Sequence, residues 1–169
     1  MFNRTYQKET LASSKLIATI YQEAKANSLK PELLAAVIIQ ESNGDPTAIR
    51  WEPDFFQKYI ANKTLKELGG HYSASCTQET ERMLRSCSIG IMQIMGQVAR
   101  EKGFKSPFLT TLLDPGTNIK LGASILAGHL RTRGSVEAAL LRWNGGANRE
   151  YPKQVLSHIE TGAIRNVLV

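Results

Sequence analysis

The sequence predicts a mainly α-helical protein of one domain. Through most of the chain, apolar residues recur at the three- and four-residue spacing of an amphipathic helix. The 169 residues are enough for a domain that buries about 70% of the surface its unfolded chain would expose. No internal repeat, low-complexity tract or interdomain linker divides the sequence. We therefore expect a single domain over residues 1–169, with room for a small β element.

Two helices are expected before residue 46. The first carries five apolar residues on one face and ends near Asn27; these residues are Leu11, Leu16, Ile17, Ile20 and Ala24. The second begins at Pro31, whose fixed φ and missing N–H suit a first helical turn. It ends before residue 46, because Gly44 and Pro46 stop a helix from continuing.

A more polar insertion is expected at about residues 50–87. It holds two small helices, within residues 53–68 and 77–86, on either side of the flexible segment 69–75. Beyond a glycine-containing apolar run at residues 88–96, four further helices are expected. They are placed at about residues 97–102, 118–133 with Asp114 as the cap, 135–143 and 149–164.

The net charge of +6 and a pI near 9.4 predict attraction to polyanions. The chain has no Lys/Arg block and no arrangement of aromatic and basic residues typical of nucleic-acid readers, so we expect no nucleic-acid partner. It also has no run of about 18 apolar residues, which argues against stable membrane insertion.

Cysteines and histidines offer no metal set. Cys76 and Cys87 are two free thiols, or they form one bridge after export. His71, His129 and His158 are isolated from one another in the sequence and from any nucleophile pattern. We therefore expect no metal and no cofactor.

Glu41 interrupts an apolar helix face. The four residues with i, i+3, i+4, i+7 spacing on one stripe are Leu34, Val37, Ile38 and Glu41. Apolar neighbours and the carbonyl dipoles of the last turn disfavour a charged carboxylate, so we expect a raised pKa for Glu41, as a general acid requires. Alternatively, Glu41 turns to solvent or pairs with an arginine such as Arg50.

Four motifs, in order, resemble the lytic transglycosylase SLT family. Residues 41–48 (ESNGDPTA) resemble the family signature whose Glu is the catalytic acid, and residues 88–95 (SIGIMQIM) resemble its S-x-G-L-M-Q-I-M element. Residues 112–126 are similar to D-P-x-x-N-I-x-x-G-x-x-Y-L, and residues 139–146 to A-Y-N-x-G. Residues 48–56 are more loosely similar to versions encoded by phages and prophages.

The resemblance implies a lysozyme-like fold related to goose-type lysozyme, with Glu41 as the catalytic acid. It implies a saccharide-binding role for residues in two of the motifs, which are Ser88, Gln93, Met95, Trp143 and Asn144. Trp143 stands where the family usually has Tyr, and an indole N–H can donate but not accept. Any hydrogen bond to Glu41 must therefore run from Trp143; otherwise Trp143 stacks on a sugar or packs over the helix. Asn144 orients substrate or stabilises the turn.

The implied partner is the glycan strand of peptidoglycan. Glu41 would protonate the oxygen between MurNAc and GlcNAc, the N-acetyl group would assist, and Glu41 would then deprotonate the C6 hydroxyl to give a 1,6-anhydroMurNAc product. One alternative is a hydrolytic muramidase of goose-lysozyme type, with Glu52 or Asp54 as the first candidates for its base. Another is a non-catalytic peptidoglycan-binding phage module.

Residues 1–15 lack the apolar core and cleavage site of an export signal. We expect a monomer. If residue 1 is the natural start, we expect the protein to be made in the cytoplasm. It would then reach the cell wall after membrane permeabilisation, as a phage or prophage endolysin does. A piece of a larger, secreted transglycosylase would give the same sequence.

Overall fold

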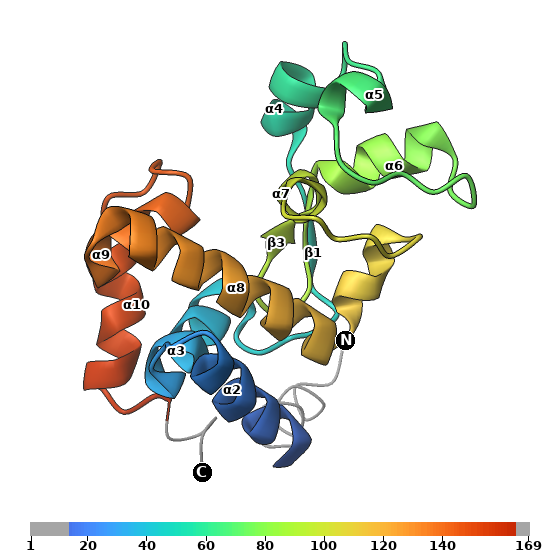
Figure 1. Cartoon of the computed structure of the whole chain (residues 1–169). Helices are drawn as coiled ribbons and strands as arrows, with labels where there is room; N and C mark the ends of the chain where they lie inside the picture. Colours follow the sequence, from blue (N-terminus) through green and yellow to red (C-terminus); the bar gives the residue numbers. More distant parts are fainter. Residues whose placement is uncertain (1–13, 165–169) are drawn as a thin grey trace, which may run out of the picture. The chain divides into compact units, whose positions relative to one another are not determined.

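The computed structural model describes residues 14–164, and the chain divides into two compact units (Figure 1). The first unit contains the chain up to Asp45 and from Gly122 onward, and the second contains residues 46–121. The expected helix position Leu11 lies outside the described residues. The predicted insertion at about 50–87 falls wholly within the second unit, which extends beyond it at both ends.

The first unit is helical throughout its regular elements. It contains α2 (Ser14–Ala26), α3 (Pro31–Ser42), the end of α8 (Pro115–Arg133), α9 (Val136–Trp143) and α10 (Tyr151–Glu160). The six consecutive residues from Leu33 to Ile38 are buried in α3, which contacts both α2 and α10 (Figure 1). Asn43 ends α3 in the left-handed region at φ 52°, and its N–H donates to Ile39 O. These contacts fix the carboxyl end of α3.

The second unit combines short helices with a small sheet. Its elements are β1 (Ile49–Trp51), α4 (Pro53–Phe55), the π-helical turn η1 (Phe56–Ile60), α5 (Leu65–Leu68), α6 (Gln78–Arg85), β2 (Cys87–Ile89), β3 (Ile94–Met95), α7 (Gly96–Glu101), the 3₁₀ turn η2 (Leu109–Leu113) and the start of α8. The strands form an antiparallel sheet in the order β1, β2, β3. Arg50 pairs with Ser88 across the first ladder, and Ser88 pairs with Met95 across the second.

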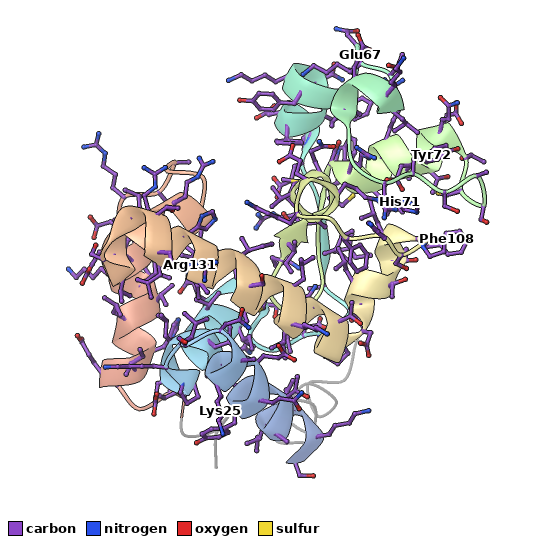
Figure 2. All side chains as sticks on the ribbon, in the orientation of Figure 1. Lys25, Glu67, His71, Tyr72, Phe108 and Arg131 are labelled. Carbon is purple, nitrogen blue, oxygen red and sulfur yellow. The ribbon has the colours of Figure 1, made fainter. Side chains whose placement is uncertain are left out.

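A buried ionic network ties the segments around α6 together. The Glu81 carboxylate accepts hydrogen bonds from Arg85 Nε at 3.0 Å and from Arg100 Nε at 2.8 Å, and all three side chains are buried. Arg85 Nη2 also donates to His71 O at 3.0 Å. His71 and Tyr72, labelled in Figure 2, lie in the segment that leads into α6. In the same segment, Tyr72 OH donates to Cys76 O at 2.6 Å. In this segment, which has no helix or strand, the Arg85 and Tyr72 side chains thus provide hydrogen-bond partners for backbone carbonyl groups.

Asn118 clamps the β2–β3 connection. Its side-chain amide donates to Ile89 O and Leu112 O, each at 2.8 Å, and its Oδ1 accepts from Met92 N–H at 2.9 Å. Gly90, at φ 76°, has no space for a side chain, because a Cβ there would lie 2.5 Å from Asn118 Nδ2. This explains the glycine that the sequence places in the apolar run.

The predicted fold class is confirmed: the protein is mainly α-helical with a small β element. Asp114 caps α8 by accepting from Thr117 N–H at 2.8 Å. Both cysteines are free and buried, and burial raises the pKa of each thiol. Within residues 14–164, no helix is both long enough and apolar enough to cross a membrane.

Candidate active site around Glu41

Glu41 lies in the last turn of α3, one turn beyond fully buried apolar side chains. Leu34, Val37 and Ile38 have no exposed surface, whereas Glu41 itself is half-buried. The apolar stripe predicted from the spacing is therefore present, and the carboxyl group stands where that stripe meets the surface of the unit. Arg50, the alternative partner considered from the sequence, pairs with Glu52 instead, at 2.6 Å.

Two aromatic side chains donate hydrogen bonds to one oxygen of Glu41. Trp143 Nε1 lies 2.8 Å from Glu41 Oε1, and Tyr151 OH lies 2.5 Å from the same atom. Trp143 is the last residue of α9, and Tyr151 is the first residue of α10. The turn between these helices therefore brings an indole and a phenol to one carboxyl group. The hydrogen bond runs from Trp143 to Glu41, the only direction an indole allows.

Tyr151 keeps its proton throughout the ordinary pH range. Burial raises the pKa of its phenol well above the usual value, and the negative charge of Glu41 and the hydrogen bond to Glu41 raise it further. The side chain is almost fully buried. The phenol is therefore a permanent donor to Glu41 and cannot serve as a base there.

A second hydrogen bond holds α10 to the end of α3. His158 Nε2 lies 2.9 Å from Gln40 Oε1, beside Glu41 in the sequence. Tyr151 and His158 are seven residues apart on α10, which places both on the helix face that packs against α3. Two side-chain contacts from one helix thus fix the backbone that carries the carboxyl group.

Asn144 stabilises the turn between α9 and α10. Its Oδ1 accepts a hydrogen bond from Asn148 N–H at 3.0 Å, across the turn that contains Gly145 and Gly146. Both glycines have positive φ, which explains their place in the motif. Of the two roles considered for Asn144, the structure shows the turn contact, and the substrate-binding role remains a prediction.

The other predicted saccharide-binding residues belong to the second unit. Ser88 is buried in β2 and donates to Glu52 Oε1 at 3.0 Å, while Met95 in β3 is partly exposed.

Gln93 adopts a positive φ of 48°, and its Nε2 donates to Ala48 O at 3.0 Å and to Gly90 O at 2.8 Å. Because these contacts occupy the amide nitrogen, the amide oxygen is the group that Gln93 can offer to a ligand.

Sequence reasoning missed Tyr151. A signal was available, because Tyr151 and Val155 are four residues apart and mark the buried face of the last helix. A phenol that begins such a face needs a hydrogen-bond partner when it is buried. No local pattern identifies Glu41 as that partner. Among residues 14–164, no group of three or more His, Cys, Asp and Glu side chains is arranged to hold a metal ion.

The fold is mainly α-helical, and the site is a carboxyl group at the end of a helix that accepts hydrogen bonds from an indole and a phenol. The family model of the transglycosylase SLT domain matches residues 18–157, and the chain belongs to this family. Glu41, Trp143 and Tyr151 lie within the matched residues, as does the segment from Ser88 to Met95.

A protein named "Transglycosylase" from Enterobacteria phage PRD1 is 27% identical to this chain over 149 residues. The similar region covers 83% of this chain and 42% of the phage protein, so the chain spans less than half the length of that relative. No solved structure matches the chain.

Proposed function

We propose that the chain is a peptidoglycan lytic transglycosylase that cleaves the MurNAc-β-1,4-GlcNAc bond, with Glu41 as its acid and then its base. Membership of the SLT domain family supports an enzyme that acts on peptidoglycan. The observation that carries the assignment of Glu41 is the pair of hydrogen bonds from Trp143 and Tyr151 to its Oε1. Two uncharged donors orient this carboxyl group at the end of a rigid helix.

The proposed reaction needs one carboxyl group. Glu41 gives its proton to the glycosidic oxygen as the bond from that oxygen to MurNAc C1 breaks. The carbonyl oxygen of the substrate's own N-acetyl group bonds to C1 and stabilises the positive charge there. The Glu41 carboxylate then removes the proton of the C6 hydroxyl, whose oxygen bonds to C1 and displaces the acetamido oxygen. Glu41 ends the cycle protonated, and the product is a 1,6-anhydroMurNAc sugar.

Trp143 and Tyr151 serve as positioning residues in this scheme. Neither can take up a proton from the carboxyl group, since the indole has no acceptor and the pKa of Tyr151 lies far above neutrality because of burial. They hold the Oε1 atom while the protonation state of Glu41 changes, and their hydrogen bonds strengthen when the carboxylate is charged.

A hydrolytic muramidase is the second candidate, and the contacts of Glu52 favour it. Glu52 Oε1 accepts from Arg50 Nε at 2.6 Å and from Ser88 Oγ at 3.0 Å, so a second carboxylate is held in a fixed position in the second unit. A hydrolase needs such a carboxylate to activate water. Asp54 is exposed and is the weaker candidate for this base.

Product analysis on purified peptidoglycan tests both functions. We expect 1,6-anhydro muropeptides from the wild type and a loss of activity of at least about 100-fold in Glu41→Gln, in the range that removal of a general acid produces. Glu32→Gln, on the same helix, is the matched control and should retain full activity. Glu52→Gln should also retain activity.

Other outcomes separate the alternatives. Reducing-end muropeptides, together with an inactive Glu52→Gln variant, would establish the hydrolase instead. Full activity in Glu41→Gln would remove the catalytic role of Glu41. A wild-type protein that binds sacculi but releases no fragments would be a non-catalytic wall-binding module.

A further inference from the structure

An aromatic hollow lies in the second unit, whereas the residues that hold Glu41 belong to the first unit. Its volume is about 240 Å³, and its walls come from β1, η1 and α6. The five residues that line it are Trp51, Phe56, Glu79, Arg82 and Met83. None of them belongs to the residues predicted from the sequence to bind or cleave substrate.

The walls of this hollow expose unusually large apolar side chains. Trp51 is 43% exposed and Met83 is 52% exposed, although both types are normally well buried. The Trp51 and Phe56 rings have centroids 5.1 Å apart at an angle of 45°, a tilted aromatic contact that restricts how the indole can turn. The indole is therefore a supported platform with an exposed surface.

Charged side chains stand beside this platform. Arg82 Nη2 donates to Ile60 O at 3.2 Å and also to Ala61 O, so its guanidinium group is anchored by the backbone at the end of η1. Both bonds use Nη2, which leaves the Nε and Nη1 hydrogens of the fork for a ligand. Glu79, in the first turn of α6, is exposed and adds acceptor oxygens.

We propose that this hollow is a subsite for an N-acetylated amino-sugar ring of the glycan strand, and the proposal rests on the proposed action on peptidoglycan. The ring substituents of a β-linked GlcNAc or MurNAc chair are equatorial, so both ring faces carry axial C–H groups, and one of these apolar faces would lie on the Trp51 indole. The hydroxyl and N-acetyl groups project from the ring edge, where Arg82 donates to their oxygens and Glu79 accepts from their O–H and N–H groups.

The mixed chemistry of the hollow favours a sugar over a purely apolar ligand. An acyl chain or an apolar protein face would cover Arg82 and Glu79 without offering hydrogen-bond partners, and desolvation of unpaired charges is costly. A sugar ring satisfies both the aromatic surface and the charged groups. Trp51 would thus add affinity for the glycan strand without taking part in bond cleavage.

The two tryptophans of the chain, Trp51 and Trp143, allow a direct binding test. In the Trp143→Phe variant, Trp51 is the remaining tryptophan, and we expect its indole emission, excited selectively over the tyrosines, to change as a chitotetraose probe, a GlcNAc tetramer, is added. Calorimetry of the Glu41→Gln protein, which retains both tryptophans, provides a second measurement without turnover. In that background, Trp51→Ala should weaken chitotetraose binding about tenfold or more.

Tyr59→Ala is the matched control. Tyr59 is as exposed as Trp51, at 43%, and lies in the adjacent η1 turn, but it does not line the hollow. We expect Tyr59→Ala in the Glu41→Gln background to bind chitotetraose as tightly as the Glu41→Gln protein itself. Thermal melting of all variants checks that each is folded. Equal affinity in the folded Trp51→Ala and Tyr59→Ala proteins, or no binding by the parent, would overturn the subsite.

Failure of the subsite and failure of the proposed function give different results. Trp51-dependent binding in a wild-type protein that releases no muropeptides would leave the subsite in place and end the enzymatic proposal. If the wild type releases anhydro muropeptides and the Trp51→Ala variant binds chitotetraose normally, the subsite is overturned and the enzymatic proposal stands.

Discussion

Tyr151 and Glu41 are separated by 110 positions in the sequence, yet the Tyr151 hydroxyl lies 2.5 Å from Glu41 Oε1. The contact forms because α10 begins at Tyr151 and packs against α3, which ends just beyond Glu41. A phenol that remains protonated thus meets a half-buried carboxyl group. The hydrogen bonds from Tyr151 and Trp143 to the same oxygen give the Glu41 carboxyl group a defined orientation.

Replacement of Trp143 tests whether its hydrogen bond contributes to turnover. Trp143→Phe keeps an aromatic ring but removes the donor to Glu41. A hydrogen bond to a charged group contributes about 1.5–3 kcal/mol. We therefore expect kcat to fall by roughly 10- to 100-fold with a smaller change in KM, measured by muropeptide release.

Trp143→Tyr provides the control for this prediction. A tyrosine at this position restores a donor that can reach toward the carboxyl group, and it is the residue the family usually carries there. We expect it to recover much of the lost kcat. Equal rates in the Phe and Tyr variants would show that the ring at position 143 acts through packing alone.

Removal of the Tyr151 hydroxyl should change the dependence of stability on pH. The pKa of Tyr151 is raised above its usual 10.0, first by burial and then by the charge of Glu41 and its hydrogen bond. Below pH 10 the phenol is protonated in both the folded and the unfolded chain. Above pH 10 only the unfolded chain loses this proton, so the free energy of unfolding falls by up to about 1.4 kcal/mol per pH unit on this account.

Urea unfolding of wild type and Tyr151→Phe between pH 7 and pH 11 measures this effect. At pH 7 the variant should lose about 1.5–3 kcal/mol, and above pH 10 it should show a shallower decline than the wild type. Tyr21 is 48% exposed, so the free energy of unfolding of Tyr21→Phe should equal that of the wild type at both pH 7 and pH 11. Parallel curves for Tyr151→Phe and the wild type would contradict the prediction.

Asn118→Ala should destabilise the second unit strongly. The substitution leaves the carbonyls of Ile89 and Leu112 and the N–H of Met92 without their buried partner. At about 1–3 kcal/mol for each unsatisfied buried group, we expect a loss of at least roughly 3 kcal/mol, measured by urea unfolding. Asn62→Ala, at an exposed position, should change the free energy of unfolding by less than about 0.5 kcal/mol. A small loss in Asn118→Ala would mean that water replaces the amide.

Local patterns in the sequence predicted the longer helices, and the resemblance of four motifs to the SLT family made Glu41 the candidate acid. Apolar spacing predicted α3 and placed Glu41 on the stripe of Leu34, Val37 and Ile38. Because an indole N–H can only donate, the sequence also predicted that any hydrogen bond between Trp143 and Glu41 would run from Trp143, as it does. Asp114 was predicted as a cap because capping depends on residues within one turn.

Contacts between distant segments were decided by tertiary packing. The family resemblance implied a substrate-binding role for Ser88, which stays a prediction, but only the structure shows that Ser88 contacts Glu52. The sequence offered no sign that Glu81 would meet Arg100 or that Tyr151 would meet Glu41. Helical and strand periodicity report which face of an element is buried, because they arise from neighbours a few residues away. The partner on the other side of that face depends on how whole elements pack, and this is set by the combined burial of many side chains across the chain.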